Sequence, residues 1–179
     1  MLTLDILSAV CTKAPRARLE LVLSALLPAL DEGEITTPAR LAMLLAQLAH
    51  ESAEFRYQEE IASGQAYEGR KDLGNVQAGD GVRFKGRGWI QLTGRLNYRG
   101  AGAALGLPLE SAPALAVVPI YSARIALWYW RRHNLNAAAD AGDLDKATRL
   151  INGGLNGLES RAGYYSAALA ALGFQPVAS

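Results

Sequence analysis

Apolar side chains recur at helical spacing along most of the 179 residues, and this pattern predicts a mainly α protein. A short helix is expected over residues 3–10 and a second over 14–30, where leucines repeat at intervals of three or four. Further helices are predicted over 97–105, 120–132, 143–150 and 160–172. Gly106 and Gly173 follow two of these segments, at the position where glycine commonly ends a helix.

The helix predicted to begin at Pro38 carries the main candidate for chemistry. Thr37 and Pro38 are suited to a helix start, as N-cap and first residue. Leu44 and Leu48 lie on its apolar face, and Glu51 continues that face at the end of the helix. Burial and the negative end of the helix dipole both favour a neutral carboxyl group, which is the form a general acid needs. The alternative is a solvated glutamate at a frayed helix end.

Three further carboxylates, Glu54, Glu59 and Glu60, follow Glu51 in a short segment without helical periodicity. Acid/base cleavage of a glycosidic bond requires two carboxyl groups held apart across a cleft. The pattern therefore indicates a glycosidase pair made of Glu51 and one of the three. Spacing alone leaves all three open as the second member.

Residues 64–88 contain seven glycines, many charges and few aliphatic side chains, which is typical of a long, turn-rich excursion. Loops of this length in compact domains are usually functional or disordered. Residues 89–93 then alternate like a short strand. In such a strand Trp89, Gln91 and Thr93 share one face, which suits the wall of a saccharide site. An ordinary half-exposed edge strand is the alternative.

Composition excludes several classes of protein. Hydrophobic residues make up 50% and charged residues 20%, so we expect one globular catalytic domain over residues 1–179. A net charge of +1 gives no reason to expect nucleic acid as a partner. Cys11 is the single cysteine, which excludes an internal disulfide, and its apolar surroundings predict a small core residue.

Targeting, membrane and metal signals are weak in this sequence. The first ten residues lack a leading basic cluster, so no secretory signal is expected. The apolar run at 19–30 is too short to span a bilayer, so no stable membrane insertion is expected. His50 and His133 have no cysteine near them, and neither a metal nor any other cofactor is expected. No serine lies in a nucleophile-elbow motif.

Three groups of motifs resemble glycoside hydrolase family 19, which includes plant-type chitinases and, more similar to this chain, bacteriophage endolysins. The first is AHES at 49–52 with Phe55 and Glu60, followed by YEGRKDLGN at 67–75. The most specific is GDG at 79–81 with RFKGRGWIQLTGR at 83–95 and NY at 97–98. The third is INGG at 151–154 with Arg161. Together they extend over about residues 40–172, in order and at plausible spacing.

The resemblance implies a lysozyme-like, two-lobed helical fold with a small, short-stranded or loop-rich excursion lining the cleft. It implies an inverting mechanism in which Glu51 is the general acid and Glu60 the general base. Thr93 matches the position that helps to hold the attacking water. Arg161 resembles the arginine near the acid, and the resemblance places further substrate contacts at Gln91, Asn97 and Asn152. Tyr67 and Trp89 are also expected to contact the substrate.

Two departures from the family pattern bear on these assignments. In the chitinases the second acid lies further along the chain, so Glu60 as base rests on the endolysin-like spacing. Endolysin relatives often have glycines at positions 53 and 54, where this chain has Ala53 and Glu54. Glu54 is expected to be a solvated surface residue, although a carboxylate close to Glu51 would favour the protonated acid by charge repulsion. Glu59 is expected to point away from the site.

The leading hypothesis is an endolysin that hydrolyses the glycan strands of peptidoglycan. It predicts a monomer made in the host bacterial cytoplasm, which passes a holin-type pore and acts on the cell wall in the periplasm. One alternative is a chitinase acting on polymers of N-acetylglucosamine. Others are a catalytically inactive saccharide-binding relative and a lytic transglycosylase, which needs only one acid.

Overall fold

The structure is a computed structural model, and it describes residues 1–174. Nine α-helices lie within these residues. They are α1 (Leu4–Val10), α2 (Arg16–Leu26), α3 (Pro38–Glu51), α4 (Asp80–Arg83), α5 (Arg95–Leu105), α6 (Pro119–Arg132), α7 (Leu135–Asp140), α8 (Leu144–Asn152) and α9 (Leu158–Ala171). Four 3₁₀ helices connect them, at Leu27–Gly33, Gln65–Tyr67, Lys71–Leu73 and Pro113–Val117.

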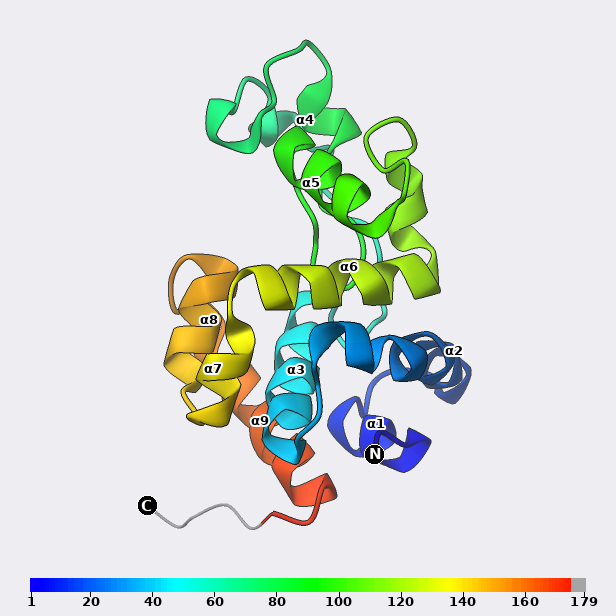
Figure 1. Ribbon diagram of the computed structural model, residues 1–179, viewed down its shortest axis with the longest axis vertical. Helices are drawn as coiled ribbons and strands as arrows, with labels where there is room; N and C mark the ends of the chain where they lie inside the picture. The colour runs from blue at the N-terminus through cyan, green and yellow to red at the C-terminus, as the bar shows by residue number, and fades with distance from the viewer. Residues whose placement is uncertain (175–179) are drawn as a thin grey trace.

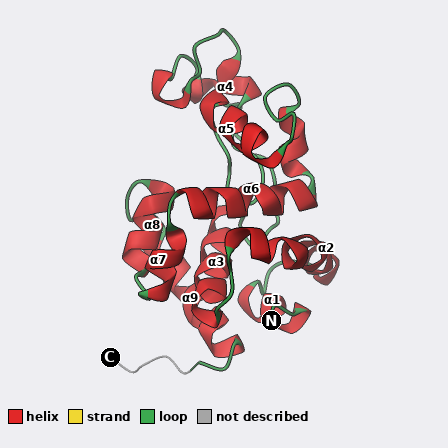
Figure 2. Ribbon diagram, viewed as in Figure 1, coloured by secondary structure: helices red, strands yellow, loops and turns green. Residues whose placement is uncertain are grey.

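The helices form two lobes, with α6 lying across the middle of the molecule (Figure 1). The lower lobe in this view contains α1, α2, α3, α7, α8 and α9, and the upper lobe contains α4, α5 and the loops around them. Figure 2 shows that long loop segments, not helices, pass between α3 and the upper lobe. The predicted mainly α, lysozyme-like fold is therefore confirmed.

Helix α3 is the centre of the lower lobe. Thr37 caps it by accepting a hydrogen bond from the Arg40 N–H at 3.2 Å, as its sequence predicts. Every residue from 41 to 49 is buried, so the helix is surrounded on all sides. It packs most extensively against α9 and also contacts α1, α7 and α8. This packing fixes the position of the last turn, where Glu51 lies.

Helix α6 is shared by the two lobes. It contacts α5 in the upper lobe and α2, α7 and the Leu27–Gly33 helix in the lower one. Ile125, Leu127 and Trp130 are fully buried on it, which agrees with the central helix predicted over 120–132. Trp128 and Tyr129 are only partly buried and pack at the edge of the core.

Local backbone conformation explains where the sequence-based boundaries differ from the structure. Pro28 ends the regular helix expected over 14–30, and the chain continues as a 3₁₀ helix. The helix predicted over 143–150 extends through residue 152, and Gly153 caps its end in a left-handed conformation. The short α7 was not predicted. It begins directly after Asn134, whose backbone has a left-handed conformation.

The strand expected over 89–93 is wrong. In residues 1–174 the only β pairing is two isolated bridges, Glu59 with Arg87 and Arg87 with Leu92. Gly88 and Gln91 have positive φ angles of 76° and 54°, and these reversals turn the segment into a compact loop. The residues 64–88 do form the expected turn-rich excursion, and within residues 1–174 no helix is long and apolar enough for a bilayer crossing.

Candidate active site

Glu51 lies at the end of α3 and is paired with a buried arginine from α9. The Arg161 guanidinium donates from one terminal nitrogen to Glu51 Oε1 and from the other to Gln47 Oε1. The Arg161 side chain is 1% exposed and that of Glu51 is 19% exposed. The expectation that Glu51 faces inward is therefore confirmed, and the placement of Arg161 beside it agrees with the family resemblance.

Gln47 is a member of this site that the sequence analysis missed. It is completely buried and lies one helical turn before Glu51, so both side chains meet the same guanidinium. The spacing of four residues was a usable signal, because residues i and i+4 share a helix face. A buried glutamine on the face that ends in a carboxylate indicates a shared partner.

The start of α9 packs closely against the end of α3. A Cβ placed on Gly157 would lie 2.2 Å from His50 Cε1, so only glycine fits at this contact. His50 Nδ1 lies 3.1 Å from Ser160 Oγ, and burial together with the Arg161 charge lowers the pKa of His50. Asn152 is exposed at the end of α8 and makes no side-chain hydrogen bond within the described residues.

Glu60 is held by the upper lobe. Its backbone N–H donates to the Gly86 carbonyl at 2.9 Å, and the Gly86 N–H donates back to Glu60 Oε2 at 3.2 Å. The Tyr67 hydroxyl donates to the other carboxylate oxygen, Oε1, at 3.0 Å. Lys85 Nζ donates to the Glu60 carbonyl at 3.0 Å. The structure thus places Glu60 and Tyr67 together, and hydrogen bonds to both oxygens stabilise the carboxylate anion.

Three predicted site residues gather around Gly86. A Cβ added to Gly86 would lie 2.7 Å from Gln91 Oε1 and 3.3 Å from both Glu60 Oε2 and Thr93 Oγ1. A side chain at position 86 would therefore collide with the polar atoms of the site. Thr93 Oγ1 donates to the Gln91 carbonyl at 2.9 Å, and Asn97 Nδ2 donates to the Thr93 carbonyl at 2.8 Å. These contacts place Thr93 beside Glu60.

Trp89 does not line a saccharide wall, and that prediction is wrong. Its side chain is 1% exposed and packs edge-on against Phe55, with ring centroids 5.2 Å apart. Its backbone N–H donates to Ser122 Oγ on α6 at 2.7 Å. The left-handed residues on either side remove the strand alternation, so Trp89 points into the core while Gln91 stays at the surface.

Glu54 is buried, and the expectation that it is solvated is wrong. Its side chain is almost completely excluded from solvent, with Oε2 accepting from the Lys13 backbone N–H at 2.5 Å and Oε1 from the Tyr164 hydroxyl at 3.0 Å. Burial, and next the hydrogen bond and charge of Glu54, raise the pKa of Tyr164 to about 12. Glu54 therefore links segments of the lower lobe through hydrogen bonds, and its buried carboxyl group is not available as the second catalytic group.

Glu59 points away from Glu60, as expected. Its carboxylate pairs with Lys85 at 3.2 Å and Arg87 at 3.0 Å, whereas Glu60 contacts Tyr67 and Gly86. Of the three carboxylates after Glu51, Glu60 is thus the one that lies with Gln91 and Thr93. Two cavities of about 630 and 690 Å³ lie elsewhere, beside α5 and α6, and neither is lined by Glu51 or Glu60.

The two lobes and the shared α6 form a lysozyme-like fold. The family model described as class I chitinase, glycoside hydrolase family 19, matches residues 36–142. Because this match covers more than half of the chain, the chain belongs to glycoside hydrolase family 19.

Curated relatives come from bacteria and plants. A glycosyl hydrolase family 19 domain-containing protein of Haemophilus influenzae is 36% identical over 108 residues, covering 60% of this chain and 52% of that protein. Endochitinase At2g43620 of Arabidopsis thaliana is 38% identical over 146 residues, covering 78% of this chain and 50% of that protein. The chain thus spans about half the length of these two curated relatives.

Solved structures of the family share the fold. Chitinase C from Streptomyces griseus superposes with a TM-score of 0.73 at 24% identity, covering 97% of this chain and 77% of that one. A class IV chitinase from Zea mays gives the same TM-score and identity, covering 99% of this chain and 95% of that one. Both similarities extend over nearly the whole of this chain.

Proposed function

We propose that this chain is an endolysin that hydrolyses the glycan strands of peptidoglycan by an inverting general acid/base mechanism. The observation that carries the chemistry is the attachment of two carboxylates to different lobes. Glu51 is paired with Arg161 in the lower lobe, and Glu60 is hydrogen-bonded to Gly86 and Tyr67 in the upper lobe. Membership of glycoside hydrolase family 19 supports a glycosidase.

In this mechanism Glu51 is the general acid. Its proton passes to the glycosidic oxygen as the bond to the anomeric carbon breaks. Arg161 is the only charged partner of Glu51 among the described residues, and its guanidinium stabilises the carboxylate left after proton transfer. The pair also fixes the carboxyl group in one orientation, since Gln47 holds the other side of the guanidinium.

Glu60 acts as the general base on the opposite face of the sugar. It takes a proton from the attacking water while the water oxygen bonds to the anomeric carbon. Thr93 Oγ1 lies beside the Glu60 carboxylate and supplies a second polar contact for that water. Gln91, Asn97 and Asn152 present amide groups for sugar hydroxyls and N-acetyl groups, and Tyr67 orients the base.

The peptidoglycan substrate is supported by residues 67–75, whose sequence resembles the phage endolysins. The proposal includes synthesis in the bacterial cytoplasm, passage through a holin-type pore and action on the cell wall in the periplasm as a monomer. A second candidate substrate is chitin, because several relatives are named endochitinases. Both polymers contain N-acetylated amino sugars, so the same carboxylates serve either.

Product analysis distinguishes the two substrates. The protein is incubated with purified sacculi and, separately, with soluble chitin oligomers, and the products are identified by mass spectrometry and by the configuration of the new reducing end. Release of reducing glycan fragments of inverted configuration from sacculi is expected. Cleavage of chitin alone would favour the chitinase, and anhydro products would indicate a lytic transglycosylase.

The two acids are tested by isosteric variants. Glu51→Gln and Glu60→Gln are each expected to lower hydrolysis at least about 100-fold, because removal of a catalytic acid or base typically costs 10²–10⁴-fold. Glu59→Gln is the matched control, being adjacent to Glu60 but paired with Lys85 and Arg87, and its activity should stay near that of the wild type. Circular dichroism checks the fold of each variant. Near-wild-type activity of both catalytic variants would contradict the mechanism.

A further inference from the structure

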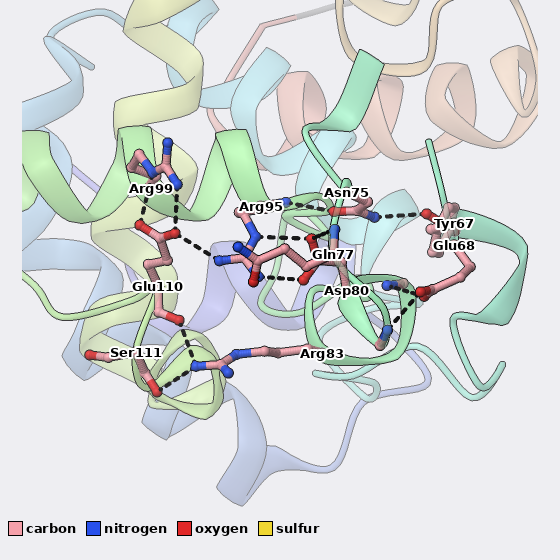
Figure 3. A network of polar contacts seen from close by, with 12 residues as sticks. Tyr67, Glu68, Asn75, Gln77, Asp80, Arg83, Arg95, Arg99, Glu110 and Ser111 are labelled. Atoms are coloured by element: carbon pink, nitrogen blue, oxygen red, sulfur yellow. Dashed lines mark hydrogen bonds and ion pairs between the residues drawn. The ribbon is translucent and has the colours of Figure 1, made fainter. Parts of the chain in front are cut away.

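Asn75 is a buried amide that joins two separate segments of the upper lobe. Its side chain is completely excluded from solvent. Asn75 Nδ2 donates to the Tyr67 carbonyl at 2.9 Å, and Asn75 Oδ1 accepts from the Arg95 backbone N–H at 2.9 Å (Figure 3). Both ends of one amide are therefore used, one on the residue that contacts Glu60 and the other on the first residue of α5.

The two segments also fit closely without space for adjustment. A Cβ on Gly74 would lie 2.3 Å from Leu96 Cγ, and one on Gly94 would lie 2.7 Å from Leu73 Cβ. Both glycines have positive φ angles, 72° and 90°, so their backbone conformation also favours glycine. The Lys71–Leu73 helix and the start of α5 therefore pack as one unit. The Asn75 side chain joins Arg95, at the start of α5, to Tyr67, which precedes that helix.

The α5 side of this link is itself held by a charged network. Arg95 is 12% exposed and pairs in two places with Asp80, which is 2% exposed. A second ion pair joins Arg95 to Glu110 at 3.0 Å. Figure 3 shows that these side chains converge on Arg95 from α4 and from the chain after α5. These ion pairs restrain Arg95, so the hydrogen bonds of Asn75 to Arg95 and Tyr67 also restrain Tyr67.

The link connects the two groups that must hold the attacking water. On one side Tyr67 donates to Glu60. On the other side Arg95 follows Thr93 by two residues, and the first turn of α5 also carries Asn97. We propose that Asn75 is a positioning residue, which fixes the distance between Glu60 and Thr93 by bridging the Tyr67 carbonyl and the Arg95 N–H. This inference rests on the proposed function of Glu60 as the base.

A double-mutant cycle tests whether Asn75 acts through Tyr67. Asn75→Ala is expected to lower kcat about 10-fold and to leave KM within about two-fold, since one misplaced hydrogen bond to the base affects the transition state. In the Tyr67→Phe background the same change should have almost no further effect on kcat, because the bond to Glu60 is already absent. Effects on kcat that multiply across the two sites would overturn the proposal.

Two further variants separate positioning from general damage to the loop. Asn75→Asp keeps the acceptor for the Arg95 N–H but places an anion against the Tyr67 carbonyl, so its kcat should match that of Asn75→Ala. Asp72→Asn alters an exposed ion pair with Arg70 in the same loop and should leave kcat unchanged. Loss of kcat in Asp72→Asn equal to that in Asn75→Ala would overturn the proposal.

A measurement without turnover keeps the inference separate from the proposed function. Fluorotyrosine incorporated at position 67 reports the environment of its ring by fluorine NMR. Glu60→Gln should shift this resonance in the otherwise wild-type chain and should shift it by less than half as much when Asn75 is alanine. An equal shift in both backgrounds would overturn the role of Asn75. Absence of hydrolysis by the wild type would instead count against the proposed function alone.

Discussion

The Arg161 side chain contributes both to the stability of the lower lobe and to the candidate active site. It is the charged partner of Glu51 and, with Gln47, forms a polar cluster inside the lower lobe. A buried ion pair is costly to form, but breaking it by removing one partner leaves an uncompensated charge and an unpaired amide. Truncation of the Arg161 side chain should therefore lower the free energy of unfolding by a large amount.

We expect Arg161→Met to lower the free energy of unfolding by about 3 kcal/mol, because the partly buried Glu51 carboxylate and Gln47 lose their donors. The matched control is Arg16→Met, which removes the ion pair with Glu20, where the side chains are 71% and 55% exposed. Its effect should be below about 0.5 kcal/mol. Urea unfolding at neutral pH measures both, and equal losses would contradict the ranking.

Cys11 gives a pH-dependent prediction at the same scale. Burial and the charge of Glu54 raise the pKa of the Cys11 thiol from 9.0 to about 12. The neutral thiol therefore contributes its full stability below pH 9.0, and the contribution is lost as the pH rises towards about 12. Urea unfolding at several pH values in this range gives the free energy of unfolding as a function of pH. This free energy should fall less steeply with pH in Cys11→Ala than in the wild type, by at most about 1.4 kcal/mol per pH unit. Parallel slopes would contradict it.

Residue-level prediction from sequence failed where the decisive partner is distant in the chain. Glu51 could be placed correctly, because the repeat of leucines on α3 defines the face it continues. Glu54 could not, because its hydrogen-bond partners Lys13 and Tyr164 lie 41 and 110 residues away. Trp89 was misplaced because no local pattern reports the reversed backbone at Gln91.

At the scale of elements, the segment after α3 carries an unusual conformation. Ala53, Glu54 and Phe55 have φ angles of 49°, 62° and 61°, three left-handed residues in succession. Such conformations cost about 1 kcal/mol or more each for residues other than glycine. The packing of Phe55 on Trp89 and the hydrogen bonds of Glu54 offset this cost at those two residues, whereas Ala53 has only a partly buried methyl group.

Ala53→Gly should therefore stabilise the protein by about 0.5–1 kcal/mol, since glycine adopts a positive φ without a steric penalty. The control is Ala141→Gly, at the end of α7 with a φ of −83°, where the added backbone freedom should destabilise by a similar amount. Thermal unfolding of both variants gives the two signs. Destabilisation by Ala53→Gly would show that the methyl group is needed for packing.

Elements with strong periodicity and clear end signals were predictable. Thr37 caps its helix as predicted, with its side chain accepting from the Arg40 N–H. Asp143, the first residue of the segment predicted over 143–150, accepts from the Lys146 N–H in the same way. The strand over 89–93 was not a strand, because five residues of alternation carry little information about backbone handedness. The six-residue α7 was missed for a related reason, since it is too short to show a period.

At the scale of the whole molecule, the two lobes and the shared α6 could not be worked out from periodicity. The two lobes were expected from the family resemblance, and the structure confirms this fold. The position of α6 between them was not predicted. Periodicity defines the buried face of each helix but does not say which helix covers it. The contacts of α3 with α9, and of α6 with α5, join residues that are distant in the sequence, so they depend on the complete fold.

The near-neutral charge of the molecule leads to a prediction about substrate capture. With a net charge of +1 the protein has little long-range field to attract an anionic polymer. KM for sacculi should therefore change by less than about three-fold between about 50 and about 200 mM salt, a range in which screening weakens electrostatic steering. Uncharged chitin oligomers are the control. A steep rise of KM for sacculi would indicate a local cationic surface at the binding site.

Eight residues separate the proposed acid from the proposed base. The chain leaves the lower lobe at Glu51, turns through the left-handed residues at 53–55 and enters the upper lobe at Glu60. The separation of the two carboxyl groups decides whether a water fits between the second carboxylate and the sugar, and therefore which anomer is released. This separation is about 6.5–9.5 Å in inverting enzymes and about 5–5.5 Å in retaining enzymes. Under the proposed mechanism, the stereochemistry of the product is therefore set by the length and handedness of a short connecting segment, which evolution can alter without changing either glutamate.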